Sequence, residues 1–268
     1  MRSRAVAWWH ASLRAVAVLN IVLWSLAAVA VARSRTSVPL AADVGGDLQL
    51  LLSAGYVAGC AFRSFLPVID IPRIVLVDSP LSRVSVGRSV ATVAELCFAA
   101  QWALMLQPIA SAARSPFVQA VSLAILPLIV LAEGCSWYAV LTTRQRPHAA
   151  ENSLWGLSAA LVVAALLAVG PGRSAVFYAL VVAGGVLYAA FIFAYDVPMY
   201  WARWRIDETG GRRYLSVARG WADVHRRGTV SYRWEDWKDE LPWMSLYFTF
   251  GVWSSIALAY ASAVRAGD

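Results

Sequence analysis

Apolar residues are concentrated in long runs along this chain, and short segments rich in arginine separate the runs. A helix needs about 20 apolar residues to cross the hydrocarbon core of a bilayer. The pattern therefore predicts an all-α, polytopic integral membrane helix bundle, forming a single transmembrane domain over residues 1–268. Seven spans are predicted, with six or eight as alternatives, at residues 15–32, 48–66, 90–109, 117–142, 154–169, 174–195 and 243–264.

Composition favours the same class of protein. Hydrophobic residues make up 60% of the chain and the mean hydropathy is +0.60. Charged residues make up 15%, against about 25% in soluble domains. The first span could also be a cleaved signal peptide ending near Ala28-Val-Ala30, but its apolar core is longer than the roughly 7–15 residues usual there. A retained helix is therefore favoured.

The distribution of basic residues predicts the orientation. Most of the 23 Lys and Arg residues lie before the first span or after the second, fourth and sixth spans. Basic loops stay in the cytoplasm, so the N-terminus is predicted to be cytoplasmic and the C-terminus external. The net charge of +7 is assigned to topology and contact with anionic membrane lipids, not to nucleic acid. We expect a multi-pass protein of the cell membrane (the inner or plasma membrane).

The segment 196–242 is longer than a connection between spans requires. Asp196-Val-Pro198 is expected to end the sixth span, because proline disfavours helix before it. Tyr214, Val217, Ala218, Trp221 and His225 follow at helical spacing and predict an amphipathic helix in the headgroup layer. Gly220 is expected to weaken that helix. The segment is either a membrane-hugging connector, a cytoplasmic lid over a site between the helices, a binder of phosphorylated headgroups through arginine, or a docking site for a partner protein. Its candidate headgroup binders are Arg203, Arg205, Arg212 and Arg213.

Two glutamates interrupt predicted spans and are the candidate catalytic residues. Glu95 lies in the third span and Glu133 in the fourth, each in the cytoplasmic half. A carboxylate in a membrane span is energetically costly and usually has a function. Consecutive antiparallel spans would allow the two to face each other, where a close pair would not ionise fully. That arrangement suits proton transfer, general acid catalysis or binding of a cation.

Other polar and aromatic residues near these glutamates predict a substrate pocket open to the cytoplasm. Helical spacing places Trp102 on the face of Glu95, and Trp137 on the face of Glu133, so the two rings are candidate pocket walls. The alternative is that each glutamate is a buried, hydrogen-bonded packing residue. The remaining candidate substrate-binding residues are Gln101, Tyr138, Glu151, Asn152 and Asp196.

Several kinds of chemistry are not supported. Cys60, Cys97 and Cys135 form no CxxC pair, so a disulfide framework or zinc ribbon is not indicated and buried free thiols are expected. Glutamate and cysteine two residues apart face different ways on a helix, which disfavours a metal site. The sequence contains no P-loop and no lysine in its last span. No metal, particular cofactor or oligomeric state is predicted.

The best interpretation is a membrane-embedded enzyme that acts on a lipid or isoprenoid substrate from the cytoplasmic leaflet. Its intramembrane carboxylates would supply acid/base chemistry or stabilise positive charge. One alternative is a proton-coupled transporter of a lipid-like or small-molecule substrate. Another is a membrane sensor or scaffold that binds a partner through residues 196–242.

Overall fold

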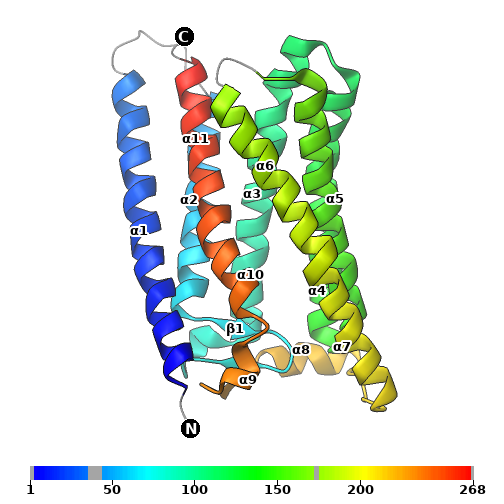
Figure 1. The fold of residues 1–268 in the computed structure, drawn as a ribbon. Helices are drawn as coiled ribbons and strands as arrows, with labels where there is room; N and C mark the ends of the chain where they lie inside the picture. The colour runs from blue at the N-terminus through cyan, green and yellow to red at the C-terminus, as the bar shows by residue number, and fades with distance from the viewer. Residues whose placement is uncertain (1–2, 36–43, 172–174, 267–268) are drawn as a thin grey trace. The chain divides into compact units, whose positions relative to one another are not determined.

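The computed structural model describes residues 3–35, 44–171 and 175–266. The chain forms two compact units: unit 1 comprises residues 1–101 and 224–268, and unit 2 comprises residues 102–223. Helices dominate both units, with η1 a 3-10 turn and η2 and η3 π-helical (Figure 1). The elements are α1 (Arg4–Arg35), α2 (Val44–Phe65), β1 (Val68–Ile69), β2 (Ile74–Val75), η1 (Pro80–Ser82), α3 (Val84–Ala113), α4 (Pro116–Thr142), α5 (Arg146–Val169), α6 (Ala175–Phe191), η2 (Ile192–Asp196), α7 (Val197–Thr209), α8 (Val217–Val224), β3 (Thr229–Val230), α9 (Trp234–Trp237), α10 (Leu241–Leu246), η3 (Tyr247–Gly251) and α11 (Val252–Ala266).

Six helical segments among the described residues are long and apolar enough to cross a membrane. Their lengths and composition support a multi-pass, all-α membrane protein. The predicted span 48–66 corresponds to α2, which is 22 residues long but is not one of the six, because its polar residues lower its hydropathy. The six segments are Arg4–Arg33, Val84–Ala113, Pro116–Thr142, Arg146–Val169, Tyr178–Thr209 and Leu241–Ala261.

In unit 1, α2 packs closely against the first part of α3. A Cβ atom at Gly55 would lie 2.9 Å from the Cys97 sulfur, and one at Gly59 would lie 2.7 Å from the Ala94 Cβ. The Gly-x-x-x-Gly spacing thus lets two helix backbones approach. Arg63, near the end of α2, is only 4% exposed.

The helix α2 also packs antiparallel to α1 and α11 within unit 1, and Figure 1 shows the three running side by side. His10 near the start of α1 lies 3.1 Å from the carbonyl oxygen of Phe65 at the end of α2. The hydroxyl oxygens of Ser255 in α11 and Ser53 in α2 lie 3.0 Å apart, within hydrogen-bond distance. These contacts fix α2 as the central helix of this group.

A small three-stranded sheet joins two distant parts of unit 1. β1 pairs antiparallel with β2 through Val68 and Val75, and β2 pairs parallel with β3 through Val75 and Val230.

The η3 π turn lies directly before α11, and π geometry displaces backbone carbonyls from the regular α pattern. Asn20 of α1 donates a 2.8 Å hydrogen bond to one of these carbonyls, that of Phe248.

In unit 2, α4 and α5 form a helical hairpin. Ser115 caps α4 by accepting a hydrogen bond from the Val118 amide, and Pro116 occupies the first turn, where its missing N–H costs nothing. Thr143 ends α4 in the left-handed conformation with φ of 60°. The connection before α5 is therefore very short, which brings the end of α4 beside the start of α5.

The sixth span does not end at Tyr195 as the sequence suggested. The helix passes through η2 and continues as α7 to Thr209. Pro198 lies in the first turn of α7, just after the π turn. Proline lacks an amide hydrogen, and a π turn can absorb such a break in the hydrogen-bond ladder without ending the helix.

The amphipathic segment predicted over Tyr214–His225 forms a helix, α8, over Val217–Val224. Its apolar Val217 and Trp221 side chains are exposed, at 49% and 57%. Gly220 is buried against the end of α4, and a Cβ atom there would lie 1.8 Å from the carbonyl oxygen of Leu141. This glycine therefore lets α8 dock on α4, a role that the sequence did not indicate.

Candidate functional site

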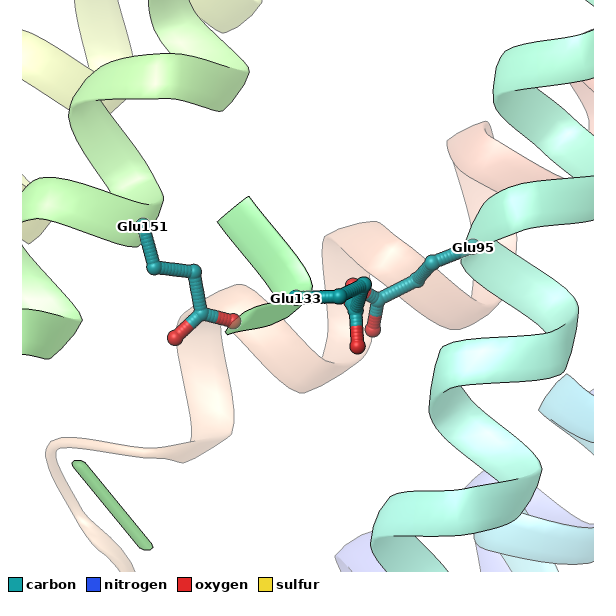
Figure 2. A group of neighbouring side chains, drawn as sticks. All are labelled: Glu95, Glu133 and Glu151. Atoms are coloured by element: carbon teal, nitrogen blue, oxygen red, sulfur yellow. The ribbon is translucent and has the colours of Figure 1, made fainter. Parts of the chain in front are cut away.

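A pair of buried carboxylates lies in unit 2, between α4 and α5. Glu133 of α4 is 4% exposed and Glu151 of α5 is 7% exposed. One carboxylate oxygen of each lies within 4.8 Å of the other (Figure 2). The hairpin between α4 and α5 brings these two positions to the same level, so that two residues predicted separately form one group.

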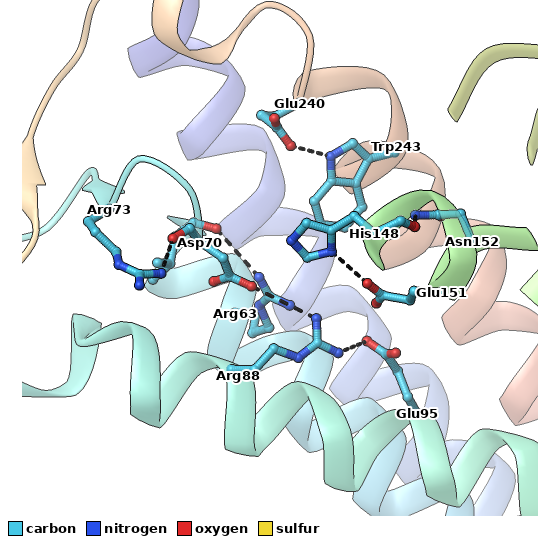
Figure 3. Close-up of polar contacts among 11 residues, drawn as sticks. Arg63, Asp70, Arg73, Arg88, Glu95, His148, Glu151, Asn152, Glu240 and Trp243 are labelled. Carbon is cyan, nitrogen blue, oxygen red and sulfur yellow. Dashed lines mark hydrogen bonds and ion pairs between the residues drawn. The ribbon is translucent and has the colours of Figure 1, made fainter. Parts of the chain in front are cut away.

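Histidine 148 extends this carboxylate pair. Its Nδ1 atom lies 2.7 Å from Oε2 of Glu151 (Figure 3). The centroid of its ring lies 5.1 Å from that of Tyr200. Asn152 donates a hydrogen bond to the His148 carbonyl oxygen at 3.0 Å. Glu133, His148 and Glu151 are called the acid–histidine group below. An imidazole against a buried carboxylate is a common means of accepting and returning a proton.

This arrangement limits the charge that the group can carry. Two ionised carboxylates so close together in a buried site repel each other strongly, so a shared proton or a bound cation stabilises the pair. Carboxylate oxygens are suitable ligands for a hard divalent cation, with water supplying further ligands. The acid–histidine group can therefore move protons or hold a cation.

The helix that contains the π turn adds a further acidic residue to this side of unit 2. A Cβ atom at Gly156 of α5 would lie 2.9 Å from Ile192, while the His148 and Tyr200 rings are 5.1 Å apart and tilted. These two contacts define an antiparallel register that puts Asp196 level with Asn152. Asp196 is 6% exposed and is therefore a further buried acid of unit 2.

A cavity of about 520 Å³ opens in unit 2 beside the acid–histidine group. Ligand sites commonly have volumes of about 300–1,000 Å³. Tyr138 is the one predicted substrate-binding residue of α4 in its wall. The wall is formed by Cys135, Tyr138, Arg144, Arg146, Pro147, Ala150, Trp204, Glu208 and Tyr214.

Aromatic rings support both arginines of this cavity. The Arg144 guanidinium carbon lies 4.9 Å from the ring centroid of Tyr214. That of Arg146 lies 5.7 Å from the ring of Trp204 and 5.8 Å from that of Trp201. A guanidinium stacked on a ring keeps its in-plane N–H groups available for a ligand. The cavity thus presents oriented cations on an aromatic surface.

Tyr214 contacts both a basic and an acidic residue of the cavity wall, Arg144 and Glu208. Its hydroxyl donates a hydrogen bond of 2.9 Å to Oε1 of Glu208. Desolvation by burial raises the pKa of Tyr214, and the hydrogen bond to Glu208 raises it further. The phenol therefore stays protonated and acts as a donor, which leaves Glu208 as the acceptor in the cavity wall.

The cavity and the acid–histidine group share neighbouring residues. Cys135, in the cavity wall, lies two residues after Glu133 and within Coulombic range of the Glu151 carboxylate. Arg146, Pro147 and Ala150 line the cavity from the same turns of α5 that hold His148 and Glu151. The cavity and the acid–histidine group are thus built on the same two helices, although none of Glu133, His148 and Glu151 is a wall residue.

Glu95, the other predicted catalytic residue, belongs to a buried ionic network in unit 1. Arg88, about two helical turns earlier on α3, contacts Oε1 of Glu95 at 3.2 Å and Oδ2 of Asp70 at 3.8 Å (Figure 3). Arg63 donates a 3.4 Å hydrogen bond to the Val68 carbonyl oxygen beside them. Arg88 is seven residues before Glu95 and shares its helix face, a signal that the sequence offered.

Gln101, predicted to bind substrate, has a structural role in unit 1. Its amide donates hydrogen bonds of 3.2 Å to the carbonyl oxygens of Gln49 and Ser255. Its side-chain oxygen accepts one of 2.6 Å from the Ser255 hydroxyl. The residue is fully buried and clasps α2, α3 and α11 together.

The other predicted binding residues lie outside the cavity wall. Trp102 and Trp137 are partly buried in unit 2 but are not wall residues. Arg212 forms an ion pair of 3.0 Å with Asp207, and Arg203 lies over the ring of Tyr200. The two remaining predicted arginines, Arg205 and Arg213, are exposed.

The two cavity arginines are not among the binding residues predicted from the sequence. Arg144 and Arg146 lie in the short connection between two spans, where basic residues are usually assigned to topology. The useful signal was their density: two arginines and His148 occur within five residues, directly between the predicted fourth and fifth spans.

Comparison of the chain with protein-family models, with curated proteins and with solved structures gave no match.

Proposed function

We propose that this multi-pass membrane protein is an enzyme that acts on a lipid or isoprenoid amphiphile from the cytoplasmic leaflet. The observation that supports the proposal is the cavity of unit 2, whose wall holds arginines and aromatic rings and is formed in part by α4 and α5, the two helices that carry the acid–histidine group. Arginine suits the polar end of an amphiphile, and aromatic side chains suit the region where headgroups meet acyl chains. Glu133, His148 and Glu151 would transfer protons at the reacting end.

The proposal includes a seven-span topology with a cytoplasmic N-terminus. Supporting it, α2 is antiparallel to α1, α3 and α11 within unit 1, and each of those three contributes to one of the six apolar segments. At 22 residues, α2 is about 33 Å long, which is enough to cross the hydrocarbon core. The cavity arginines then lie on the cytoplasmic side, in the connection between the fourth and fifth spans.

Glu95 is proposed as a second functional carboxylate, acting through its own network in unit 1. Its ion pair with Arg88 favours the ionised form, so its proposed contribution is negative charge, not a transferable proton. Glu133 and Glu151, being a close carboxylate pair, are the proposed proton carriers.

The enzyme proposal is tested by reconstituting the full chain in liposomes made from total membrane lipid and following the lipid composition by mass spectrometry. Wild-type protein should convert at least one lipid, and Glu133→Gln should abolish that conversion while thermal unfolding stays close to wild type. Glu235→Gln, at an exposed position, is the matched control and should remain active. An active Glu133→Gln protein would contradict the assignment.

A proton-coupled carrier is the second candidate, favoured by one observation. The helix that contains Asp196 passes through a π turn, and π turns within helices are frequent at functional sites. A carrier would leave the lipid composition unchanged and would accumulate a substrate in proteoliposomes only under a pH gradient. Loss of that uptake in Glu133→Gln, without any lipid conversion by the wild type, would favour the carrier.

A further inference from the structure

The arginines of the cavity in unit 2 indicate the chemistry of the ligand. Arg144, in the short connection between α4 and α5, and Arg146, at the first position of α5, line one cavity. Both guanidinium groups lie near aromatic rings, and among the residues that the structure describes neither forms an ion pair or hydrogen bond. Other loop cations differ: Arg212 is paired with Asp207 and Arg227 with Asp78.

Aromatic rings lie within cation–π distance of both arginines. A guanidinium held by a ring in this way keeps its N–H groups available to donate to a ligand. Arg146 also lies at the start of α5, where the helix dipole favours a negative ligand. Two arginines against one glutamate leave the cavity wall with an excess of positive charge.

The number of donors distinguishes phosphate from carboxylate. One guanidinium satisfies a carboxylate through two parallel hydrogen bonds, whereas a phosphate has enough oxygen atoms to accept from two arginines at once. Tyr138 and Trp204 supply the cavity with amphipathic aromatic surface suited to the first part of an apolar chain. The Glu208 carboxylate, which accepts from Tyr214, can accept a hydrogen bond from a ligand hydroxyl.

We propose that this cavity binds a phosphate ester through Arg144 and Arg146, and that the phosphate is the headgroup of an amphiphile. This inference rests on the proposed function, since it names the class of substrate that would be presented to the acid–histidine group. It also assigns headgroup binding to two residues other than the four arginines expected from the sequence.

The first experiment measures binding to the full chain in detergent by isothermal titration calorimetry. The probes are dioctanoyl phosphatidate, which has chains and phosphate, dioctanoylglycerol, which lacks the phosphate, and glycerol 3-phosphate, which lacks the chains. Phosphatidate should bind at least about tenfold more tightly than dioctanoylglycerol, the size of one charge-assisted hydrogen bond. Equal affinity for these two probes would overturn the phosphate assignment.

The third probe separates a membrane source of the phosphate from a soluble one. Weak binding of glycerol 3-phosphate relative to phosphatidate supports the lipid headgroup. Equal binding of the two would keep the phosphate site but overturn the assignment to an amphiphile.

Variants then test the residues. Arg144→Gln and Arg146→Gln should each weaken phosphatidate binding about tenfold or more while leaving dioctanoylglycerol unchanged. Arg219→Gln removes an exposed cation of α8 that is not a wall residue and should bind like wild type. If Arg219→Gln weakens phosphatidate binding as much as the cavity variants do, general surface charge and not this cavity would account for the binding.

Folding and catalysis are kept separate from binding in this design. Arg144→Lys and Arg146→Lys retain the positive charge but lose the planar guanidinium. These conservative variants are included in case a glutamine variant fails to fold. They should still bind phosphatidate less tightly than wild type. Glu133→Gln should bind phosphatidate normally even though it is expected to lack turnover. Normal binding with no turnover in the wild type would contradict the proposed enzyme while sustaining the phosphate site.

Discussion

Gln49 and Gln101 hold α2 and α3 together by reciprocal hydrogen bonds, each side-chain amide donating to the backbone carbonyl of the other. The distances are 2.8 Å from Gln49 Nε2 to the Gln101 oxygen and 3.2 Å in the opposite direction. Such pairing satisfies polar groups that a bilayer cannot solvate. Gln101, which was predicted to bind substrate, thus joins helices.

Replacement of Gln101 should reduce stability without changing the chemistry of unit 2. Gln101→Leu removes its hydrogen bonds to Gln49 and Ser255, and interhelical hydrogen bonds in membranes are each worth about 0.6–1.7 kcal/mol. We expect a loss of about 1–3 kcal/mol in the free energy of unfolding, measured by denaturant titration in detergent. Gln107→Leu, at an exposed position on the same helix, should be nearly neutral. Similar stability of both variants would argue against the clasp.

Replacement of Arg88 should be more costly, because Arg88 contacts two buried carboxylates. Arg88→Met removes a cation from Glu95 and Asp70, and breaking a buried ion pair costs about 3–5 kcal/mol. Adding Glu95→Met should recover part of that loss, since one uncompensated charge is also removed. Arg227→Met, which breaks an exposed pair with Asp78, should cost less than about 1 kcal/mol in the same unfolding assay. A double variant less stable than Arg88→Met would contradict this account.

The docking of α8 on α4 should depend on the absence of a side chain at Gly220. A Cβ atom at this position would overlap the Leu141 backbone, which cannot move aside like a flexible side chain. Gly220→Ala should therefore displace α8 and accelerate amide hydrogen exchange over Val217–Val224. Gly134→Ala is the control, because its Cβ atom would meet nothing within 4 Å. It should leave the protein as stable or more stable by up to about 1 kcal/mol, and unchanged exchange in Gly220→Ala would disprove the contact.

Tyr214 should remain protonated beyond the range in which a free tyrosine titrates. Burial and the Glu208 carboxylate raise its pKa above the usual value of about 10. The folded state then binds the phenolic proton more tightly than the unfolded state. The stability that results is complete below the normal pKa and is lost as the pH rises through the folded one.

The measurement for Tyr214 is the difference in phenolate absorbance between wild type and Tyr214→Phe during alkaline titration. Glu208→Gln should lower the pKa of Tyr214 only in part, because desolvation is the larger cause. A Tyr214 signal that titrates at or below the normal range would show that its hydroxyl is solvated.

The sequence predicted the apolar helices because their signal is local. A run of apolar residues near bilayer length identifies a span without any knowledge of its neighbours. The same local reasoning ended the sixth span at Asp196-Val-Pro198, and there it failed. A proline need not end a helix where a π turn accommodates it. Here the π turn η2 packs against α5, a contact that a local sequence pattern does not show.

Partners of the polar residues were harder to predict than the residues themselves. Glu133 and Glu151 were both singled out, but their proximity depends on the short turn at Thr143. Arg88 and Arg144 were counted as charges that set topology, although one is buried in an ionic network and the other stacks on Tyr214. Pairing is a property of the folded chain, which a single sequence describes poorly.

The uninterrupted path from Tyr178 to Thr209 makes this helix longer than a membrane is thick. Its 32 residues extend about 48 Å, whereas the hydrocarbon core measures about 30 Å. Trp204 and Glu208 therefore lie on the part of the helix that extends beyond the hydrocarbon core. Thinning or thickening of the surrounding bilayer changes the tilt of such a helix and moves this extended end most. The affinity of the cavity should accordingly vary with the acyl-chain length of the host lipids.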